Sequence, residues 1–360
     1  MIRIKPIGIR IEYREDQSPI LKVISLVIAI LAALAVSAVL IYFWGADVGM
    51  AFSALFSGAF GDTRAIIDTL IKATPLIFTG LAAAIAFRAQ IWNIGGEGQF
   101  IAGAMGAYLA ITLFDGFPRI ILIIATLVFA FIAGALVAGF SAFIKNRFDV
   151  DVIISTVMMN YIIGFGLSLL LFTIWRDPDS FYQHSPFIPE ASEFPMVYAK
   201  YSFHAGFILA LLAATSVYLL VEKSSYGYEL RAIGLNPIAA KFKGINPART
   251  LMWVMLLSGG IAALGGAVEL TGLTQRLRPD ISINYGFTGI IVAMLANLHP
   301  LGVIASSILF GGLINGSFRM QVQTGVPIAI VYAIQAIILL FVLSASVLTR
   351  YTIRRDRDVE

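Results

Sequence analysis

Residues 120–144 read IILIIATLVFAFIAGALVAGFSAFI, a run of 25 residues without a charge between Arg119 and Lys145. A helix of about 20 apolar residues crosses a bilayer core of about 30 Å, so this run is long enough to span a membrane. Uncharged runs of 24 residues also follow Lys22 and Asp151. All three runs are continuously apolar, whereas the strands of a membrane β-barrel alternate apolar and polar residues. The sequence therefore predicts an all-α integral membrane protein.

The composition of the whole chain agrees with this fold class. Of its 360 residues, 59% are hydrophobic and only 13% are charged, and the mean hydropathy is +0.88. These values lie outside the range of soluble domains, which excludes most soluble enzymes and nucleic-acid-binding proteins. The chain has no cysteine and only three isolated histidines, so we expect no disulfide, no cysteine nucleophile and no metal site.

Breaks between the apolar runs predict about ten transmembrane helices within residues 23–348, which we treat as a single transmembrane domain. One boundary is open, because the 38 uncharged residues of 281–318 must be divided at Asn297-Leu298-His299-Pro300. A proline after a polar triplet makes a re-entrant or broken helix pair the alternative to two full spans. The predicted helices lie near 23–44, 65–87, 98–114, 120–144, 152–174, 204–221, 250–270, 286–298, 300–318 and 326–348.

The positive charges predict the orientation of these helices, because Lys and Arg concentrate in the cytoplasmic segments of membrane proteins. With the N-terminus inside, 17 of the 25 Lys and Arg residues lie on the inside and 8 on the outside. We therefore expect a cytoplasmic N-terminal segment at 1–22 and a cytoplasmic C-terminal tail at 349–360. In this arrangement the loop 222–249 is cytoplasmic and the loop 175–203 is external. The net charge of +4 then indicates orientation and requires no acidic substrate.

One polar stretch interrupts the apolar pattern, with the sequence Ile91-Trp92-Asn93-Ile94-Gly95-Gly96-Glu97-Gly98-Gln99. Gly95 and Gly96 break the helix there, between two apolar segments that leave little room for a solvated loop. Irregular backbone at membrane depth persists where it faces protein or water, so the stretch is predicted to line a cavity. The alternative is a plain cytoplasmic turn that caps two helices.

Ionisable residues inside the predicted helices are few. Asp68 and Lys72 are four residues apart on one helical face, where they can neutralise each other near the outer surface. Glu269 lies near the outer end of its helix, where water can solvate it. An ion-coupled secondary transporter needs a buried acidic or histidine relay, so that function is the weaker alternative for this chain. A membrane enzyme needs a cluster of catalytic groups, and the sequence suggests none.

A short helix is predicted on the cytoplasmic side, just before the helix 250–270. Asn236 is a typical N-cap, Pro237 suits the first helical position, and Gly244 can end the helix in a left-handed conformation. Ile238 and Phe242 share one face of its two turns. A helix this short is marginal in water, so its apolar face indicates a docking partner.

The stretch Gly234–Ile245 resembles the coupling-helix motif of ABC importer permeases, in the family that serves branched-chain amino acids, simple sugars and nucleosides. Ile91–Gln99, together with Ser155–Tyr161, resembles the nucleoside and simple-sugar subgroup more closely still. The resemblance runs from about residue 65 to 345. It implies a type II-like importer permease with an inverted internal repeat. In the predicted layout, helices two to five and seven to ten have opposite orientations, as such a repeat requires.

The resemblance implies the function and the partners. The chain would be a permease subunit in the cytoplasmic (inner) membrane, forming half of the translocation pathway for a nucleoside or simple sugar. It would not be an enzyme, since it has no G-x-x-x-x-G-K-[ST] phosphate loop. ATP and Mg would be held by a partner ATPase in the cytoplasm. A second homologous permease, forming a heterodimer, and an extracytoplasmic solute-binding protein or lipoprotein complete the expected assembly, which involves no nucleic acid.

Two sets of site residues follow from this resemblance. The helix 237–243 would lie in a groove of the ATPase and transmit its ATP-driven closure through Gly234, Asn236, Pro237, Ala239, Ala240, Phe242 and Gly244. The solute would pass Asn93, Glu97, Gln99 and Asn160, although interhelical hydrogen bonding explains Asn160 equally well. The outer loop 175–203, which contains four prolines, is a lid, a docking surface for the binding protein, or plain extracellular decoration.

Overall fold

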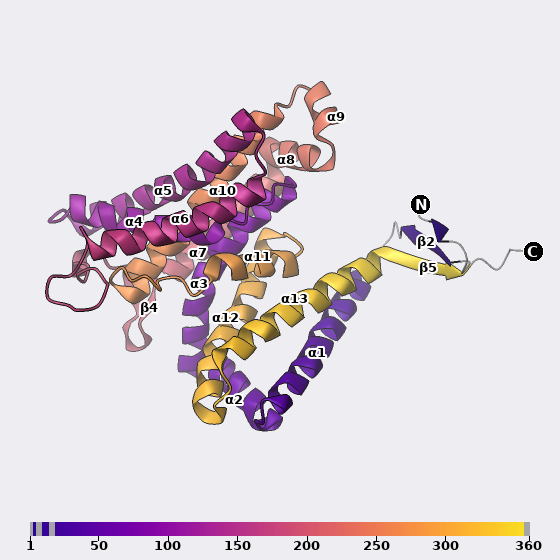
Figure 1. Ribbon diagram of the computed structural model, residues 1–360, viewed down its shortest axis with the longest axis horizontal. Coiled ribbons are helices and arrows are strands. Elements are labelled where there is room, and N and C mark those ends of the chain that lie inside the picture. The colour runs from indigo at the N-terminus through magenta and orange to yellow at the C-terminus, as the bar shows by residue number, and fades with distance from the viewer. Residues whose placement is uncertain (1–2, 5–8, 14–18, 356–360) are drawn as a thin grey trace, which may run out of the picture. The chain divides into compact units, whose positions relative to one another are not determined.

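The computed structural model describes residues 3–4, 9–13 and 19–355 and consists mostly of helices (Figure 1). It divides into two compact units, each described here by itself. One unit comprises Met1–Leu55 and Gly316–Glu360, and the other comprises Phe56–Asn315. Two helices, α2 (Val48–Phe60) and α12 (Pro300–Thr324), run across the division.

The unit Phe56–Asn315 carries both sets of predicted site residues. Its long helices are α3 (Thr63–Arg88), α4 (Gly96–Leu113), α5 (Arg119–Phe148), α6 (Val152–Phe172), α7 (Gly206–Lys223) and α10 (Pro247–Glu269). Its shorter elements are α8 (Ser225–Leu235), α9 (Pro237–Phe242), α11 (Tyr285–Leu295), the 3-10 turns η1 (Glu190–Ser192) and η2 (Ala199–Tyr201), the π-helical turn η3 (Leu270–Thr274) and the strands β3 (Met196–Tyr198) and β4 (Phe203–His204).

Small residues bring the central helices of this unit close together, because α10 packs against α3, α4 and α5. A Cβ added to Gly103 on α4 would lie 2.1 Å from the carbonyl oxygen of Ala263 on α10. One turn earlier on α10, Gly259 faces Gly134 of α5, and a Cβ on either glycine would lie 2.4 Å from the carbonyl oxygen of the other. The glycines thus let backbones touch where lipid supplies no hydrophobic drive between helices.

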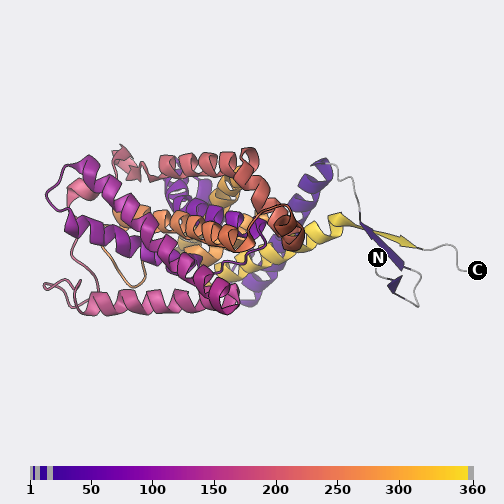
Figure 2. The same ribbon diagram turned by 90° about the horizontal axis from the view of Figure 1, so that it is seen from above.

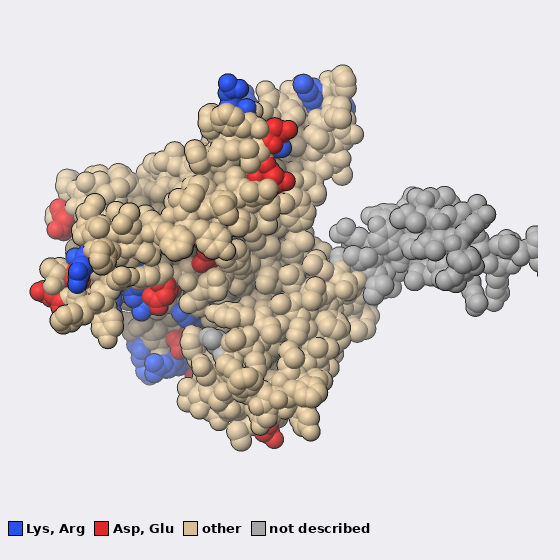
Figure 3. Space-filling view, viewed as in Figure 1, with Lys and Arg blue, Asp and Glu red and all other residues tan. Residues whose placement is uncertain are grey.

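The outer helices expose apolar side chains in a way that suits a membrane. The apolar core of α3 is 89% buried, whereas those of α5 and α6 are only 33% and 28% buried. Helix α5 lies along one edge of the unit in Figure 1, and α6 lies along one edge in Figure 2. On the face of this unit seen in Figure 3, charged side chains gather towards the ends, with a broad uncharged stretch between them. Among the described residues, six helices are long and apolar enough to cross a membrane: α3, α5, α6, α7, α10 with η3, and α12.

Every one of the ten predicted helices has a counterpart, and the differences lie in the short elements. Helix α2 fills part of the expected loop between the first two spans, and its 13 residues, about 20 Å, are too few to cross a bilayer. Helix α11 has 11 residues and extends about 16 Å, so it is not a full span. Its end coincides with the predicted break, since Asn297 and Leu298 have positive φ and α12 begins at Pro300.

The other unit is built on two antiparallel helices, α1 (Pro19–Phe43) and α13 (Ile328–Arg350), which lie side by side in Figure 1. Beyond them a small antiparallel sheet has the order β1 (Arg3–Ile4), β2 (Ile9–Tyr13), β5 (Tyr351–Arg355). Strand β2 pairs with β5 so that Ile9 lies opposite Arg355 and Tyr13 opposite Tyr351. The sequence analysis did not predict this sheet.

Candidate functional site

The polar stretch that the sequence selects forms an irregular connection between α3 and α4. Helix α3 ends at Arg88, Gln90 takes a left-handed conformation with φ of 58°, and α4 begins at Gly96. The backbone nitrogen of Ile91 still donates to the carbonyl oxygen of Ala86, at 3.0 Å. The connection is therefore folded tightly against the end of α3.

Asn93 and Gln99 form a paired amide interaction inside this connection. Asn93 Nδ2 donates to Gln99 Oε1 at 3.1 Å, and Gln99 Nε2 donates back to Asn93 Oδ1 at 2.9 Å. Asn93 Nδ2 also donates to Ser258 Oγ on α10 at 2.9 Å, and that hydroxyl donates to the carbonyl oxygen of Ala82 on α3. All three side chains are buried. A chain of hydrogen bonds thus ties the connection to α3 and α10.

Asn160 on α6 bridges two backbone groups of the same stretch. Its Oδ1 accepts from the backbone nitrogen of Gly98 at 2.7 Å, and its Nδ2 donates to the carbonyl oxygen of Ile94 at 3.0 Å. Thr156, one turn earlier on α6, accepts from the backbone nitrogen of Ile94 at 3.3 Å. The lone amide in mid-helix therefore makes interhelical hydrogen bonds.

Glu97 connects the first turns of two helices. It lies in the first turn of α4, and its Oε2 accepts from the backbone nitrogen of Gly286 in the first turn of α11, at 2.8 Å. The backbones meet closely there, because a Cβ on Gly286 would lie 2.1 Å from the nitrogen of Glu97. An acidic group is favourable at a helix N-terminus, and this one serves two helices at once.

The structure thus brings Asn93, Glu97, Gln99 and Asn160 together around one connection. Each is at most 9% exposed. Asn93, Glu97 and Asn160 each make a hydrogen bond to a distant part of the chain, and Gln99 is paired with Asn93. In this conformation these side chains shape the connection, and their contact with a solute stays a prediction. Sequence reasoning missed Ser258 and Gly286, because small residues of both kinds are frequent in the apolar helices and neither has a distinguishing spacing.

The charged residues of the predicted spans are placed differently from expectation. Glu269, predicted to be near solvent, is the last residue of α10 before the π-helical turn and is only 5% exposed. Asp68 has its ion pair with Arg64, at 3.8 Å between Arg64 Nε and Asp68 Oδ2. Among the described residues, Asp68 makes no ion pair with the expected partner, Lys72.

The predicted capped helix is present as α9. Asn236 Oδ1 accepts from the backbone nitrogens of Ile238 and Ala239, each at 3.0 Å, and Pro237 occupies the first turn. Gly244 follows with φ of 85°, as predicted for the end of the helix. Asn246 then caps α10 through the backbone nitrogen of Arg249 at 3.2 Å. The caps that the sequence predicts at Asn236 and Gly244 are therefore confirmed.

Helix α9 presents an apolar surface to its surroundings. Phe242 is 90% exposed and Ile238 is 70% exposed, whereas Ala240 faces inward and is buried. The preceding helix α8 was not predicted, and Asn236 both ends α8 and caps α9. Between α8 and α9 lies a largely apolar groove of about 370 Å³, lined by Tyr228, Arg231, Ala232, Leu235, Asn236, Ala239, Ala240, Lys243 and Ile245.

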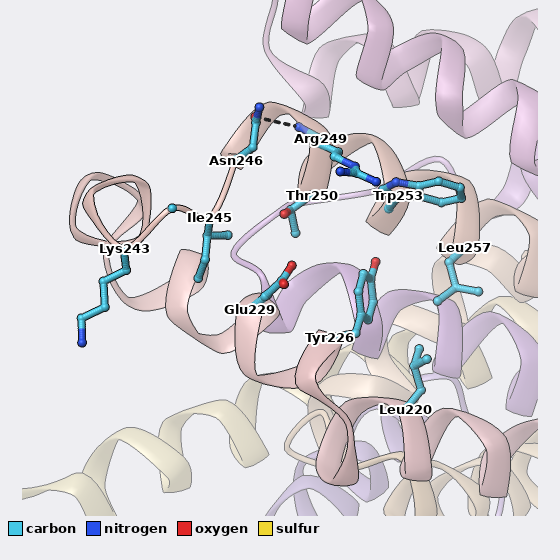
Figure 4. A pocket seen from close by; sticks show the side chains of 11 residues that line it. Leu220, Tyr226, Glu229, Lys243, Ile245, Asn246, Arg249, Thr250, Trp253 and Leu257 are labelled. Atoms are coloured by element: carbon cyan, nitrogen blue, oxygen red, sulfur yellow. Dashed lines mark hydrogen bonds between the residues drawn. The ribbon is translucent and has the colours of Figure 1, made fainter.

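A second cavity, of about 670 Å³, lies on the side of α8 that faces α10 (Figure 4). Tyr226 and Glu229 reach into it from α8, and α10 contributes Thr250 and Trp253. Burial, with a smaller contribution from the charge of Glu229, raises the pKa of Tyr226 to about 12, so this phenol remains protonated at neutral pH. The remaining lining residues are Leu220, Lys243, Gly244, Ile245, Asn246, Arg249 and Leu257.

The loop 175–203 is folded against the chain beyond α10. The backbone nitrogens of Ser185, Ile188 and Phe194 donate to the carbonyl oxygens of Leu277, Gln275 and Thr271, respectively. Arg276 also lies over the ring of Phe187, with 4.7 Å from its guanidinium carbon to the ring centroid. The loop therefore covers the π-helical turn η3 and the residues that follow it.

Comparison with known proteins shows that the chain is similar to permease proteins of transport systems. The family described as "Branched-chain amino acid transport system / permease component" matches residues 65–343. The guanosine ABC transporter permease protein NupP of Bacillus subtilis is 36% identical, with 88% of this chain and 92% of that protein covered. The glucose ABC transporter permease protein TsgB13 of Haloferax volcanii is 30% identical, with 92% and 91% covered. The guanosine ABC transporter permease protein NupQ of B. subtilis is 27% identical, with 68% and 78% covered.

Proposed function

The chain belongs to the permease family of branched-chain amino acid transport systems, and from this premise we propose that it imports a nucleoside or a simple sugar with energy from a partner ATPase. It is a multi-pass membrane protein and a permease subunit of an ABC importer. The observation that carries the proposal about energy coupling is α9, a short helix capped at both ends that exposes Phe242 and Ile238. An exposed apolar helix of this kind suits docking in a groove of another protein.

The substrate class follows from the relatives. NupP and NupQ are named for guanosine, and TsgB13 is named for glucose. We favour a nucleoside because NupP is more similar to this chain than TsgB13 is, at 36% against 30% identity. A nucleoside and a sugar are both neutral and rich in hydroxyl groups, so they can pass along a route by weak, replaceable hydrogen bonds.

The proposed route passes the connection between α3 and α4. Asn93, Glu97, Gln99 and Asn160 are hydrogen-bonded to the chain in this conformation. For the solute to contact them, the connection must open during transport. Opening requires movement of α11, because Glu97 accepts from Gly286 at its first turn. These hydrogen bonds would close the proposed route in the conformation seen, and a movement in another part of the chain must break them.

The proposed energy source is a cytoplasmic ATPase that binds ATP and Mg. Helix α9 would seat Phe242 and Ile238 in its groove, with Pro237 and Gly244 fixing the two ends of the helix. A helix with defined ends transmits a push better than a mobile loop does. Ala239 is exposed and belongs to this surface, whereas Gly234 and the buried Ala240 would support it from within the chain.

Two further partners complete the proposed assembly. B. subtilis has two proteins, NupP and NupQ, that are both named as guanosine permeases. We therefore propose a heterodimer of this chain with a second, related permease. A solute-binding protein or lipoprotein would dock on the loop 175–203 from outside the cell. In this assembly both termini and the α8–α9 region lie in the cytoplasm.

Affinity purification in mild detergent tests the proposal. The tagged wild-type chain should retain an ATPase subunit and a second permease, identified by mass spectrometry. Ala239→Arg should lose the ATPase and keep the second permease, because Ala239 is exposed on α9. Ala199→Arg, the same change at an exposed alanine of the external loop, should retain both. The proposal is wrong if the wild type retains no ATPase, or if Ala239→Arg retains as much ATPase as Ala199→Arg.

A further inference from the structure

The last residue of α3 joins three parts of the chain that lie far apart in sequence. Arg88 Nη1 lies 2.5 Å from Glu222 Oε1 near the end of α7, and Arg88 Nε donates to the carbonyl oxygen of Leu298 at 2.8 Å. The backbone carbonyl of Arg88 also meets α8, because a Cβ on Gly234 would lie 2.5 Å from that oxygen. We call Arg88, Glu222, Gly234 and Leu298 the Arg88 bridge.

We infer that Arg88 and Glu222 are positioning residues that transmit movement of α9 to α11, and through α11 to the connection that holds Glu97. The inference rests on the proposed function, in which an ATPase moves α9. It assigns a role to residues that neither bind the ATPase nor contact the solute.

The first step runs from α9 to Arg88. Helices α8 and α9 share Asn236, which ends one and caps the other, and they pack against each other, so movement of α9 carries α8 with it. Helix α8 is held at both ends by close backbone contacts. A Cβ on Gly227 would lie 1.9 Å from the carbonyl oxygen of Val221, and Gly234 rests against Arg88. A push on α9 therefore reaches Arg88 through backbone atoms rather than through mobile side chains.

Ionic contacts reinforce this attachment on the α7 side. Arg231 of α8 donates to the carbonyl oxygen of Val221 at 2.6 Å, and its Nη1 lies 3.8 Å from Glu222 Oε2. Glu222 thus has an arginine on each side, one from α3 and one from α8. Its side chain is 28% exposed and that of Arg88 is 14% exposed, so water screens this pair less than a surface pair.

The second step runs from Arg88 to α11. Leu298 has φ of 59° and Asn297 has φ of 50°, in the turn that follows α11. A bulky residue is uncommon in this left-handed region, so the surrounding contacts must hold the turn in place. The backbone nitrogen of Leu298 donates to the carbonyl oxygen of Ala293 within α11, at 2.8 Å. A displacement of Arg88 would therefore displace the end of α11.

The third step runs along α11 to the candidate route. This helix has only 11 residues, and such a short helix moves as a rigid rod. At its other end, Gly286 donates to Glu97 and the carbonyl oxygen of Tyr285 accepts from Thr79 Oγ1 at 3.0 Å. The Arg88 bridge thus lies at one end of α11 and the closed connection at the other.

The shape of the arginine side chain matters for this role. Arg88 uses Nε for Leu298 and Nη1 for Glu222, two donors of one planar fork. Lysine carries the same charge on a single nitrogen and cannot reproduce both directions at once. Arg88→Lys therefore keeps attraction to Glu222 while weakening the contact with the turn after α11.

The test uses the purified complex with its ATPase, second permease and solute-binding protein, reconstituted in proteoliposomes, with guanosine as the probe. Guanosine uptake per ATP hydrolysed is measured for the wild type and for Arg88→Lys. We expect this ratio to fall about fivefold or more, the lower end of couplings between distant sites. Arg64→Lys is the matched control, since Arg64 is on the same helix in a largely exposed ion pair, and its ratio should not change.

A merely structural role would lower the amount of folded complex and would reduce uptake and hydrolysis together, leaving the ratio unchanged. That result would overturn the inference. If the Arg88→Lys complex cannot be purified, Glu222→Gln is used instead, because it removes the charge from the bridge and keeps a hydrogen-bond acceptor. A wild-type complex that takes up neither guanosine nor glucose with ATP would contradict the proposed function rather than this inference.

Hydrogen exchange of the chain in nanodiscs, without nucleotide, tests the bridge separately from transport. Arg88→Lys should speed exchange of the amides of 285–299 and leave those of α5 unchanged, whereas Arg64→Lys should alter neither. Unchanged exchange at 285–299 in Arg88→Lys would overturn the inference whatever the complex transports.

Discussion

Replacing Asn160 tests how the connection between α3 and α4 is held. Asn160→Leu keeps a side chain of similar size but removes the acceptor for Gly98 and the donor for Ile94. Asn160 is 7% exposed, so little water can replace these bonds. A buried backbone group left without its partner costs about 1–3 kcal/mol. The loss of both partners should therefore destabilise the folded chain by about 3 kcal/mol.

The assay is thermal unfolding of the purified chain in one detergent, followed by tryptophan fluorescence. A change of 1 kcal/mol shifts the Tm of a large domain by roughly 2 °C, so Asn160→Leu should lower the apparent Tm by about 6 °C. Met158→Leu is the control, because Met158 lies on the same helix and is 52% exposed. A Tm for Asn160→Leu within about 1 °C of the control would refute the claim that this amide holds the connection.

Three further predictions follow from close contacts and exposure. Gly266→Ala should lower the apparent Tm, because its Cβ would lie 2.0 Å from the carbonyl oxygen of Phe100 and overpacking costs about 1–3 kcal/mol; Gly164→Ala, with no atom within 4 Å, should not lower it. Gly286→Ala should reduce uptake more than the yield of folded protein, since its Cβ would collide with the backbone of Glu97; equal losses of both would contradict this. The chain has no native cysteine, so single introduced cysteines can be tested without background. A cysteine that replaces Asn93, Glu97, Gln99 or Asn160 should react with a small aqueous thiol reagent in at least one nucleotide state. If none of the four reacts in any state, these residues do not line the route.

The features predictable from the sequence are those encoded by local composition. Each uncharged run predicts a helix because a membrane span must satisfy its own backbone hydrogen bonds. The caps of α9 could be predicted at the level of single residues, because Asn236, Pro237 and Gly244 act within one or two turns of themselves.

Other features depend on contacts between distant residues, and for that reason the sequence did not indicate them. Strands β2 and β5 pair residues more than three hundred positions apart, and no local pattern marks their register. Helix α2 is apolar but too short to be predicted as a membrane span. Glu269 was expected near water because of its position along α10, but neighbouring elements cover it.

The candidate site shows the same division. Composition selected Asn93, Glu97, Gln99 and Asn160, and the structure brings all four to one connection. Sequence reasoning did not predict that Asn93 binds Ser258, that Glu97 binds Gly286, or that Asn93 and Gln99 pair with each other. Ser258 lies on α10 and Gly286 lies on α11, so only the packing of the helices shows that these polar groups already have partners.

ATP-driven uptake by the reconstituted complex tests the central claim most directly. Proteoliposomes that contain this chain with its ATPase, second permease and solute-binding protein are given labelled guanosine or labelled glucose. Each solute is tested with ATP or with a non-hydrolysable analogue, in the presence and absence of a proton ionophore. We predict that one of the two solutes accumulates with ATP, that the analogue does not support accumulation, and that the ionophore has no effect. Accumulation that is independent of ATP and abolished by the ionophore would contradict the account and would identify an ion-coupled transporter.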